Sequence, residues 1–283
     1  MGRRLRRALT AALGAVFLFS VCYIIVARLE YRASARRYEE AAARFTSHGA
    51  GADGSGGPGE GTGSGMSGSG PAGQGAPFAG SPPITVDFAG LQAVNGDVCG
   101  WLYCPGTPID YPVLRGEDDD AYLHRAYDGS YSAGGSLFVE ALNRPGFADA
   151  NTIVYGHHMR DGSMFACLER WAEPGFYEAH PVMWLLTPEG DYRIDIFAGY
   201  TTSGYSDTYT IYTEGCPELA EYLGRCLEQS DFAAGTEPEA GGRYVTLSTC
   251  AYAFTDARYV LHGRLVPVDS AGGEAPSDGQ GRG

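Results

Sequence analysis

The first pattern in the chain is a long apolar run directly after a basic N-terminus. Residues 2–7 carry four arginines, and residues 8–27 then contain no charged side chain for 20 positions. A stretch of that length spans a bilayer as a helix, whereas the apolar core of a cleaved signal peptide usually has about 7–15 residues. We therefore predict an uncleaved, single-pass membrane anchor at residues 8–27, which contacts the lipid bilayer, with residues 1–7 as a basic cytoplasmic tail.

The arginines do not decide the orientation of this anchor. Four of them precede the span, and four more follow it at Arg28, Arg32, Arg36 and Arg37. The positive charge of the free amino terminus is the only excess on the N-terminal side of the span, and it favours a cytoplasmic N-terminus. An extracellular position for the rest of the chain therefore rests mainly on the family resemblance given below.

Composition divides the remaining sequence into four parts. Residues 28–46 are rich in Ala, Arg and Glu, which favour a juxtamembrane helix continuing the anchor. Residues 47–83 consist mostly of Gly, Ser, Ala and Pro and predict a flexible linker, and residues 269–283 predict a similar disordered tail. This leaves residues 84–268, enough for a single domain with one hydrophobic core.

Short runs of strand-forming residues at close spacing fill most of residues 84–268. The predicted strands are 100–103, 109–114, 136–139, 152–155, 182–187, 192–200 and two runs within 243–266. Helical patterns are fewer and cover 88–94, 164–171 and 217–229, the last with Pro217 in its first turn. The fold class is mainly β, an antiparallel barrel or sandwich with a short N-terminal helix.

Alternation along the last two strands separates two sets of side chains. In the first strand, Thr246, Ser248 and Cys250 share one face, and Cys250 lies at the strand's end. In the second strand, Arg258 and His262 share one face. A thiol is only a few per cent ionised at pH 7, and a nearby cation favours the thiolate, so Cys250 paired across strands with Arg258 is a candidate nucleophile.

A histidine at the end of an earlier strand completes a candidate set for catalysis. Four strand-forming residues at 152–155 lead into Gly156, and His157 follows, where an imidazole can serve as general acid and base. Its neighbour His158 projects differently, and His262 lies four residues from Arg258, about 13 Å along the strand. We therefore predict His157, Cys250 and Arg258 as the catalytic residues.

Charge and metal-ligand spacing exclude several other functions. The formal net charge is −14, which disfavours a nucleic-acid partner. The acidic run at residues 117–120 lacks the spacing of a calcium loop and is interpreted as a solvated turn. No Cys-x-x-Cys pair or zinc-type Cys/His spacing occurs, which argues against a zinc site. The prediction that the protein needs no metal and no other cofactor follows from the family resemblance described below.

The disulfide state is open at this point. Cys22 lies in the predicted span and Cys250 is assigned to catalysis, which leaves five cysteines at 99, 104, 167, 216 and 226. An odd number cannot pair completely within one chain. Most of these thiols are expected to be buried.

The residues around the catalytic set resemble those of the sortases. Thr246-Leu247-Ser248-Thr249-Cys250 is similar to their TLxTC signature, with Arg258 following at the matching position, and Tyr155-Gly156-His157 resembles the motif around their histidine. The resemblance extends from about residue 84 to 268. An interval of 93 residues between His157 and Cys250, long enough to hold an inserted helix, favours class B.

The resemblance implies a closed sortase β-barrel with an inserted helix before the catalytic strand. It also implies a cysteine transpeptidase that cleaves a C-terminal sorting signal on exported proteins through an acyl-enzyme thioester. The acceptor would be a cell-wall amine such as that of a peptidoglycan precursor. The substrate-binding candidates are Ser248, Thr249 and Tyr209. Family resemblance places the loop at 201–214 beside the substrate groove, where Tyr205, Tyr209 and Tyr212 either line that groove or pack against the barrel.

Two alternatives remain open from the residues alone. A cysteine peptidase would use the same groups with water as acceptor. A membrane-anchored binding module would need none of them for its activity.

Overall fold

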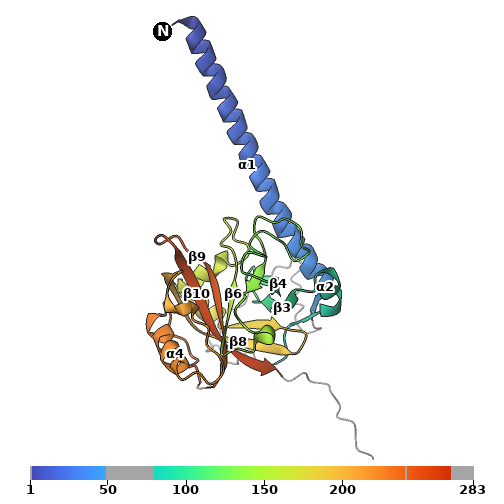
Figure 1. Cartoon of the computed structure of the whole chain (residues 1–283), viewed down its shortest axis with the longest axis vertical. Helices are drawn as coiled ribbons and strands as arrows, with labels where there is room; N and C mark the ends of the chain where they lie inside the picture. The colour runs from blue at the N-terminus through green and yellow to red at the C-terminus, as the bar shows by residue number, and fades with distance from the viewer. Residues whose placement is uncertain (1, 49–79, 240, 269–283) are drawn as a thin grey trace, which may run out of the picture.

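The computed structural model describes residues 2–48, 80–239 and 241–268, and its centre is a closed barrel of eight strands (Figure 1). Around the barrel the strand order is β10-β8-β7-β3-β4-β5-β6-β9. The strands are β3 Val98–Tyr103, β4 Asp110–Leu114, β5 Leu137–Val139, β6 Asn151–Tyr155, β7 Val182–Leu186, β8 Asp191–Ser203, β9 Arg243–Cys250 and β10 Ala257–Val268. The predicted mainly β barrel is therefore confirmed.

Two parallel pairings interrupt an otherwise antiparallel barrel. β4 pairs with β5 and β6 pairs with β9 in parallel, while the other neighbours are antiparallel. Because β6 and β9 run in the same direction, their C-terminal ends lie at the same end of the barrel. This places the residues that follow Tyr155 next to Cys250.

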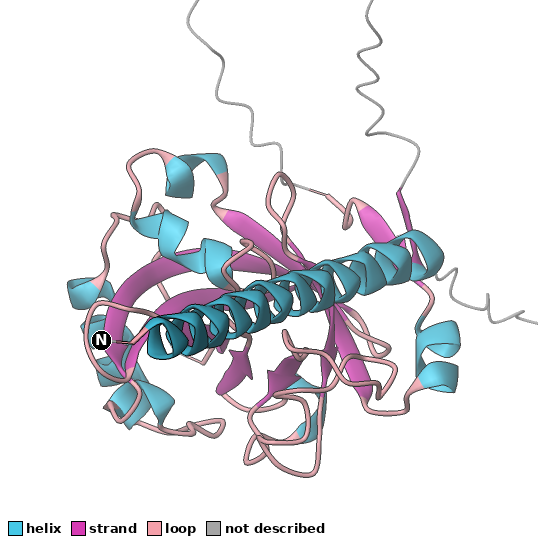
Figure 2. Cartoon of the chain, turned by 90° about the horizontal axis from the view of Figure 1, so that it is seen from above, coloured by secondary structure: helices cyan, strands magenta, loops and turns pink. Residues whose placement is uncertain are grey.

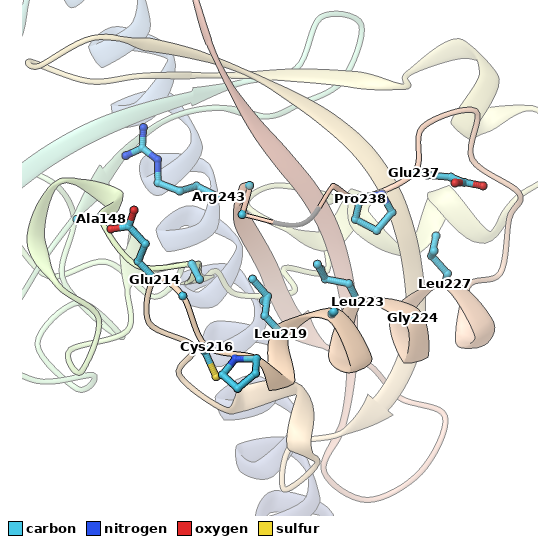
Figure 3. Close-up of a pocket in the computed structure, with 16 residues that line it drawn as sticks. Ala148, Glu214, Cys216, Leu219, Leu223, Gly224, Leu227, Glu237, Pro238 and Arg243 are labelled. Carbon is cyan, nitrogen blue, oxygen red and sulfur yellow. The ribbon is translucent and has the colours of Figure 1, made fainter.

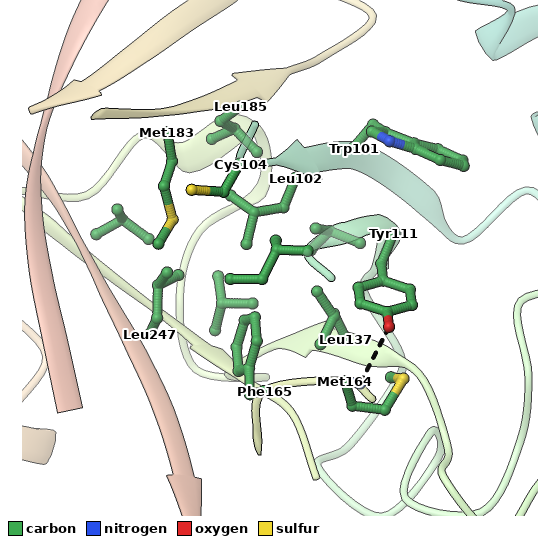
Figure 4. Packing of buried hydrophobic residues seen from close by; sticks show 14 of the residues in the cluster. Trp101, Leu102, Cys104, Tyr111, Leu137, Met164, Phe165, Met183, Leu185 and Leu247 are labelled. Carbon is green, nitrogen blue, oxygen red and sulfur yellow. Dashed lines mark hydrogen bonds between the residues drawn. The ribbon is translucent and has the colours of Figure 1, made fainter. Parts of the chain in front are cut away.

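The alternation in the last two strands separates an inner from an outer core. Val245, Leu247 and Leu261 point into the barrel, where Leu247 packs with Phe165 and Met183 (Figure 4). Each fully buried side chain of this size stabilises the fold by about 1.5–3 kcal/mol. The opposite face of β10 carries Val260, which packs in the cluster beneath helix α4.

The helices lie outside the barrel (Figure 2) and mostly agree with the predicted segments. They are α2 Phe88–Val94, η1 Pro145–Phe147, η2 Ala166–Ala172, α3 Phe176–Ala179, η3 Asp207–Tyr209 and α4 Glu218–Gln229. The helix predicted at 164–171 is a 3-10 helix that begins two residues later, at Ala166, and Met164 before it has a positive φ of 57°. Pro217 occupies the N-cap of α4 and not its first turn.

Helix α4 is the inserted helix between β8 and β9. Leu219, Tyr222, Leu223 and Cys226 recur at helical spacing and are buried against the outer face of the barrel. The helix closes that face without contributing a residue to the cavity that holds Cys250.

Helix α1, Arg3–Phe45, runs without a break from the predicted anchor onto the barrel (Figure 1). Its Ala12–Phe45 portion contains an apolar window of 18 residues, none of it buried, so the helix is long and apolar enough to cross a membrane. The last turns differ, because Ser34, Tyr38, Ala41 and Phe45 are buried against the barrel.

This packing moves the start of the folded domain upstream of residue 84. Strand β1, Thr46–His48, pairs with β2, Ile84–Val86, so Ser47 and His48 belong to the fold and not to the linker predicted at 47–83. The buried face of α1 has spacings of three and four residues, which buries one stripe of a helix. The central part of the predicted linker and the predicted tail at 269–283 lie outside the described residues.

Candidate active site

The three predicted catalytic residues meet at one end of the barrel. Cys250 ends β9 and is the direct register partner of Arg258, near the start of β10. His157 follows β6, which pairs in parallel with β9. All three line one cavity of about 230 Å³. Its other lining residues are Asp119, Asp120, Leu123, Phe138, Tyr155, Gly156, Ser248 and Thr249.

The His157 imidazole is held by a backbone carbonyl. Its Nε2 lies 2.8 Å from the Leu123 oxygen, and because a carbonyl only accepts, Nε2 carries the hydrogen. In the neutral ring, Nδ1 is then the basic nitrogen. Burial lowers the pKa of His157, and the nearby ring of His124, stacked at 5.7 Å between centroids, lowers it further.

A neutral imidazole suits proton transfer. Because the pKa of His157 lies below the ordinary value of a histidine, most molecules at pH 7 carry the ring ready to accept a proton. The Leu123 carbonyl fixes which nitrogen does so. The hydrogen bond between His157 and Leu123 could not be predicted from the sequence, because every residue type offers a backbone carbonyl as acceptor.

The Arg258 side chain makes few polar interactions with the rest of the protein. Its Nη1 donates to the carbonyl of Ala257 at 3.0 Å, and it forms no salt bridge with any described residue. The side chain is partly exposed in the cavity wall. Its remaining guanidinium donors are therefore available to a ligand.

The predicted substrate-binding residues have different environments. Ser248 lines the cavity, and its Oγ lies 2.8 Å from the hydroxyl of Tyr209, whose ring stacks on Tyr155 at 6.2 Å. Thr249 is buried, and its hydroxyl has no partner among the described residues. Tyr209 itself does not line the cavity and supports it from behind.

The other two tyrosines of the loop at 201–214 are not alike. Tyr212 is buried and packs on Tyr222 with ring centroids 4.7 Å apart, so it belongs to the outer core. Tyr205 is 87% exposed.

An acidic wall was missed by the sequence interpretation. Asp119 and Asp120, in the run expected to be a solvated turn, line the cavity with Cys250. Asp119 accepts a hydrogen bond from the backbone N–H of Ala141 at 2.8 Å, and its pKa is raised by burial. The turn is thus part of the site. The sequence showed the acidic run but not its position beside Cys250.

The remaining histidines lie outside the cavity. His158 approaches Glu169 at 3.4 Å and contacts the ring of Tyr252 edge-on at 5.2 Å. His262 is fully buried beneath α4, and burial lowers its pKa to about 3. Its Nδ1 donates to the Thr246 hydroxyl at 3.0 Å, since that hydroxyl already donates to Asn151.

The cysteines are unpaired in the structure. All seven are free thiols, and of the five left open by the sequence, Cys104, Cys167 and Cys226 are buried. Within the described ranges, no group of three His, Cys, Asp or Glu side chains is placed to hold a metal ion.

A larger cavity, about 930 Å³, lies elsewhere, between α4 and the beginning of β9 (Figure 3). It is lined by Leu219 and Leu223 of α4 and by Arg243, seven residues from Cys250 along the strand. That separation is about 23 Å at 3.3 Å per residue. Its size therefore says nothing about the chemistry at Cys250.

Comparison with known proteins agrees with this geometry. A family model described as Sortase domain matches residues 102–266, which is more than half of the chain. The chain belongs to the sortase family. Like its relatives, it is a cysteine transpeptidase that cleaves a sorting signal.

Two relatives of known class place the chain in class B. Sortase B of Listeria monocytogenes serovar 1/2a is 38% identical over 180 residues, covering 62% of this chain and 72% of that protein. Sortase B of Staphylococcus aureus is 30% identical over 183 residues, covering 64% and 75%. The structure of an S. aureus sortase B-substrate complex matches with a TM-score of 0.60 at 30% identity, over 64% of this chain and 85% of that one.

A second solved structure gives the same result. Sortase B of Bacillus anthracis in complex with AAEK1 matches with a TM-score of 0.59 at 34% identity, over 64% of this chain and 84% of that one. The predicted class B assignment is therefore confirmed.

Proposed function

We propose that Cys250 is the nucleophile of this transpeptidase. Its Sγ would attack the carbonyl carbon of the scissile peptide bond, and collapse of the tetrahedral intermediate would break the C–N bond and leave a thioester on Cys250. An incoming amine would then attack the thioester, form the new peptide bond and release the thiol. The observation that carries this proposal is the shared cavity of Cys250, His157 and Arg258.

His157 would transfer the protons in both halves of the reaction, the formation of the thioester and its attack by the incoming amine. With Nε2–H donated to Leu123, Nδ1 takes the proton of the Cys250 thiol and passes it to the leaving amine. In the second half, the same nitrogen accepts a proton from the attacking amine and returns it to the departing thiolate. The lowered pKa of His157 keeps this nitrogen unprotonated at the start.

Arg258 would stabilise the developing oxyanion or hold the substrate backbone. A guanidinium on a strand offers several fixed donors, and removing one oxyanion donor typically costs about 10²–10³-fold in rate. Ser248 and Thr249, beside the nucleophile, and Tyr209, behind Ser248, would shape the groove for the sorting peptide.

The partners follow from the relatives. One structure of S. aureus sortase B contains a substrate, and another sortase B has been solved in complex with triglycine. For this chain we propose exported proteins with a sorting signal as donors and a cell-wall peptide amine as acceptor. Helix α1 would anchor the enzyme in the cell membrane, with the barrel on the extracellular side.

The test is cleavage of a sorting peptide by the purified protein with and without a peptide amine. We expect a ligated product at saturating amine and a thioester adduct on Cys250 detectable by mass spectrometry, both absent in Cys250→Ala. Hydrolysis alone at saturating amine would favour the peptidase alternative. Unchanged activity in Cys250→Ala would refute the assignment of the nucleophile.

A further inference from the structure

The end of the barrel that carries the active site is also the end from which α1 leaves toward the predicted membrane. β9 ends and β10 begins at this end, and Figure 1 shows their connection on the same side as the N-terminal part of α1. In the view from above, α1 passes across this end of the barrel (Figure 2). The active site therefore faces the region where a bilayer would lie.

Little chain separates the predicted span from the barrel. The apolar stretch ends at Ala27, and Ser34 is already buried against the barrel. Seven residues of helix cover only about 10 Å. A helix of this kind leaves no slack for the barrel to move away from the membrane.

A loop next to His157 reaches as far as the span itself. A cavity of about 610 Å³ lies between α1 and residues 160–161, and its walls come from both. It is lined by Tyr23, Ile24, Arg28 and Arg32 of α1 and by Arg160 and Asp161 of the loop. Because Tyr23 and Ile24 belong to the predicted span, this loop lies at the level of the membrane surface.

The charges in this cavity suit lipid phosphates. The guanidinium groups of Arg28, Arg32 and Arg160 form no salt bridge with any described residue, and the carboxylate of Asp161 accepts from the N–H and hydroxyl of Ser163. Three such cations together in a chain of net charge −14 are a local exception. Arginines beside a membrane span attract anionic lipid headgroups.

The connection between β9 and β10, at this same end of the barrel, carries exposed aromatic side chains. The β9–β10 connection exposes Tyr252 and Phe254, which are 73% and 52% exposed. Tyr252 contacts His158, so this connection and the loop at 158–161 form one continuous surface, which we call the membrane-proximal rim (residues 158–161 and 251–256). Aromatic side chains are favoured at the boundary between water and hydrocarbon.

We propose that the membrane-proximal rim rests on an anionic bilayer surface, with Arg28, Arg32 and Arg160 at the phosphates and Tyr252 and Phe254 in the interface. The proposal rests on the anchor proposed above. Contact between the rim and the bilayer would direct the active site toward substrates that are still anchored in the same membrane. Confining both partners to one surface raises their effective concentration, while a soluble peptide gains nothing from it.

The direct test is hydrogen–deuterium exchange on the full chain in nanodiscs containing phosphatidylglycerol, compared with neutral detergent micelles. We expect amides of residues 251–256 to exchange at least about fivefold more slowly in nanodiscs, with residues 140–143 unchanged. Leu142 in that control segment is 79% exposed and belongs neither to the membrane-proximal rim nor to the cavity around Cys250. Equal exchange of the rim in both media, with residues 12–27 protected in both, would refute rim contact and leave the anchor intact. Unprotected residues 12–27 in nanodiscs would overturn the anchor and the rim contact together.

A functional test uses the double variant Tyr252→Ser/Phe254→Ser with Leu142→Ser as matched control. In vesicles, we expect the double variant to cleave a sorting signal attached to its own membrane span about tenfold more slowly than the parent. Cleavage of the soluble peptide should stay within about twofold, and Leu142→Ser should change neither. Equal losses on both substrates would show that the connection serves the catalytic groups, and would refute the proposal.

Discussion

Tyr38, on the last turns of α1, is predicted to stabilise both the fold and the position of His157. Only 2% of its surface is exposed, and its ring packs edge-on against Tyr111 with centroids 5.3 Å apart. Its hydroxyl donates to the carbonyl of Gly135 and contacts the Ser136 hydroxyl at 2.9 Å. Burial raises its pKa, so the hydroxyl stays protonated and donating at any physiological pH.

The magnitude follows from what each substitution removes. Tyr38→Ala deletes a buried aromatic ring, which typically costs about 3–5 kcal/mol of unfolding free energy. Tyr38→Phe keeps the ring but leaves the Gly135 carbonyl without its donor, at about 1–3 kcal/mol. Against a total stability of about 5–15 kcal/mol, the first change is severe and the second moderate.

The catalytic effect passes through the segment that Tyr38 supports. Ser136 donates its backbone N–H to the Tyr122 carbonyl, and the next residue, Leu123, holds His157. Loosening this segment should lower kcat of the Tyr38→Ala variant even at temperatures where it is folded. Tyr38→Phe should keep most of the rate.

The assay is urea unfolding followed by circular dichroism, together with peptide cleavage, on chains that begin at Arg28. Tyr131→Ala is the matched control, because that side chain is 66% exposed and should cost less than about 0.5 kcal/mol. If Tyr38→Ala unfolds at the same urea concentration as Tyr131→Ala, the last turns of α1 do not belong to the folded domain.

Further predictions concern single groups. Arg258→Lys keeps the charge but loses the planar fork, so kcat/KM for a sorting peptide should fall about 10²-fold; near-parental turnover would leave Arg258 as a charge alone. Because the pKa of His157 is lowered, the acid limb of kcat/KM should lie below about pH 6.5, and His124→Gln should move it to higher pH by removing a neighbouring charge; a limb that stays in place would contradict this coupling. His262 has a pKa of about 3 when folded and about 6.5 when unfolded, so the unfolded chain binds the extra proton and stability should be lost as pH falls from about 6.5 toward 3. His262→Phe should flatten the melting temperature over that window, and an unchanged slope would assign the acid sensitivity elsewhere.

The sequence predicted the parts of the fold that local pattern controls. Alternation separated the two faces of the strand at 243–250, and the end of its strand-forming run located Cys250 at the strand's end. The register that pairs Cys250 with Arg258 also followed, because a short connection between two antiparallel strands leaves few alternatives.

The features that were missed depend on tertiary contacts. The buried face of α1 was present as a spacing of three and four residues through Tyr38, Ala41 and Phe45, but its alanines and charges also suit a solvated helix. The pairing of β1 with β2 joins segments on either side of a Gly-rich stretch, and no local pattern indicates such a partner. The role of Asp119 in the cavity wall likewise depends on where its turn is placed.

The parallel pairing of β6 with β9 has a consequence for how activity arises during biogenesis. It joins residues about 90 positions apart, and closing a loop of that length costs about 4 kcal/mol of chain entropy before the contacts repay it. Until β6 pairs with β9, the imidazole of His157 and the thiol of Cys250 are not neighbours, and neither group is more reactive than in a free peptide. On the proposed topology, a chain that crosses the membrane unfolded is therefore a latent enzyme, and it acquires its chemistry only where the barrel is completed.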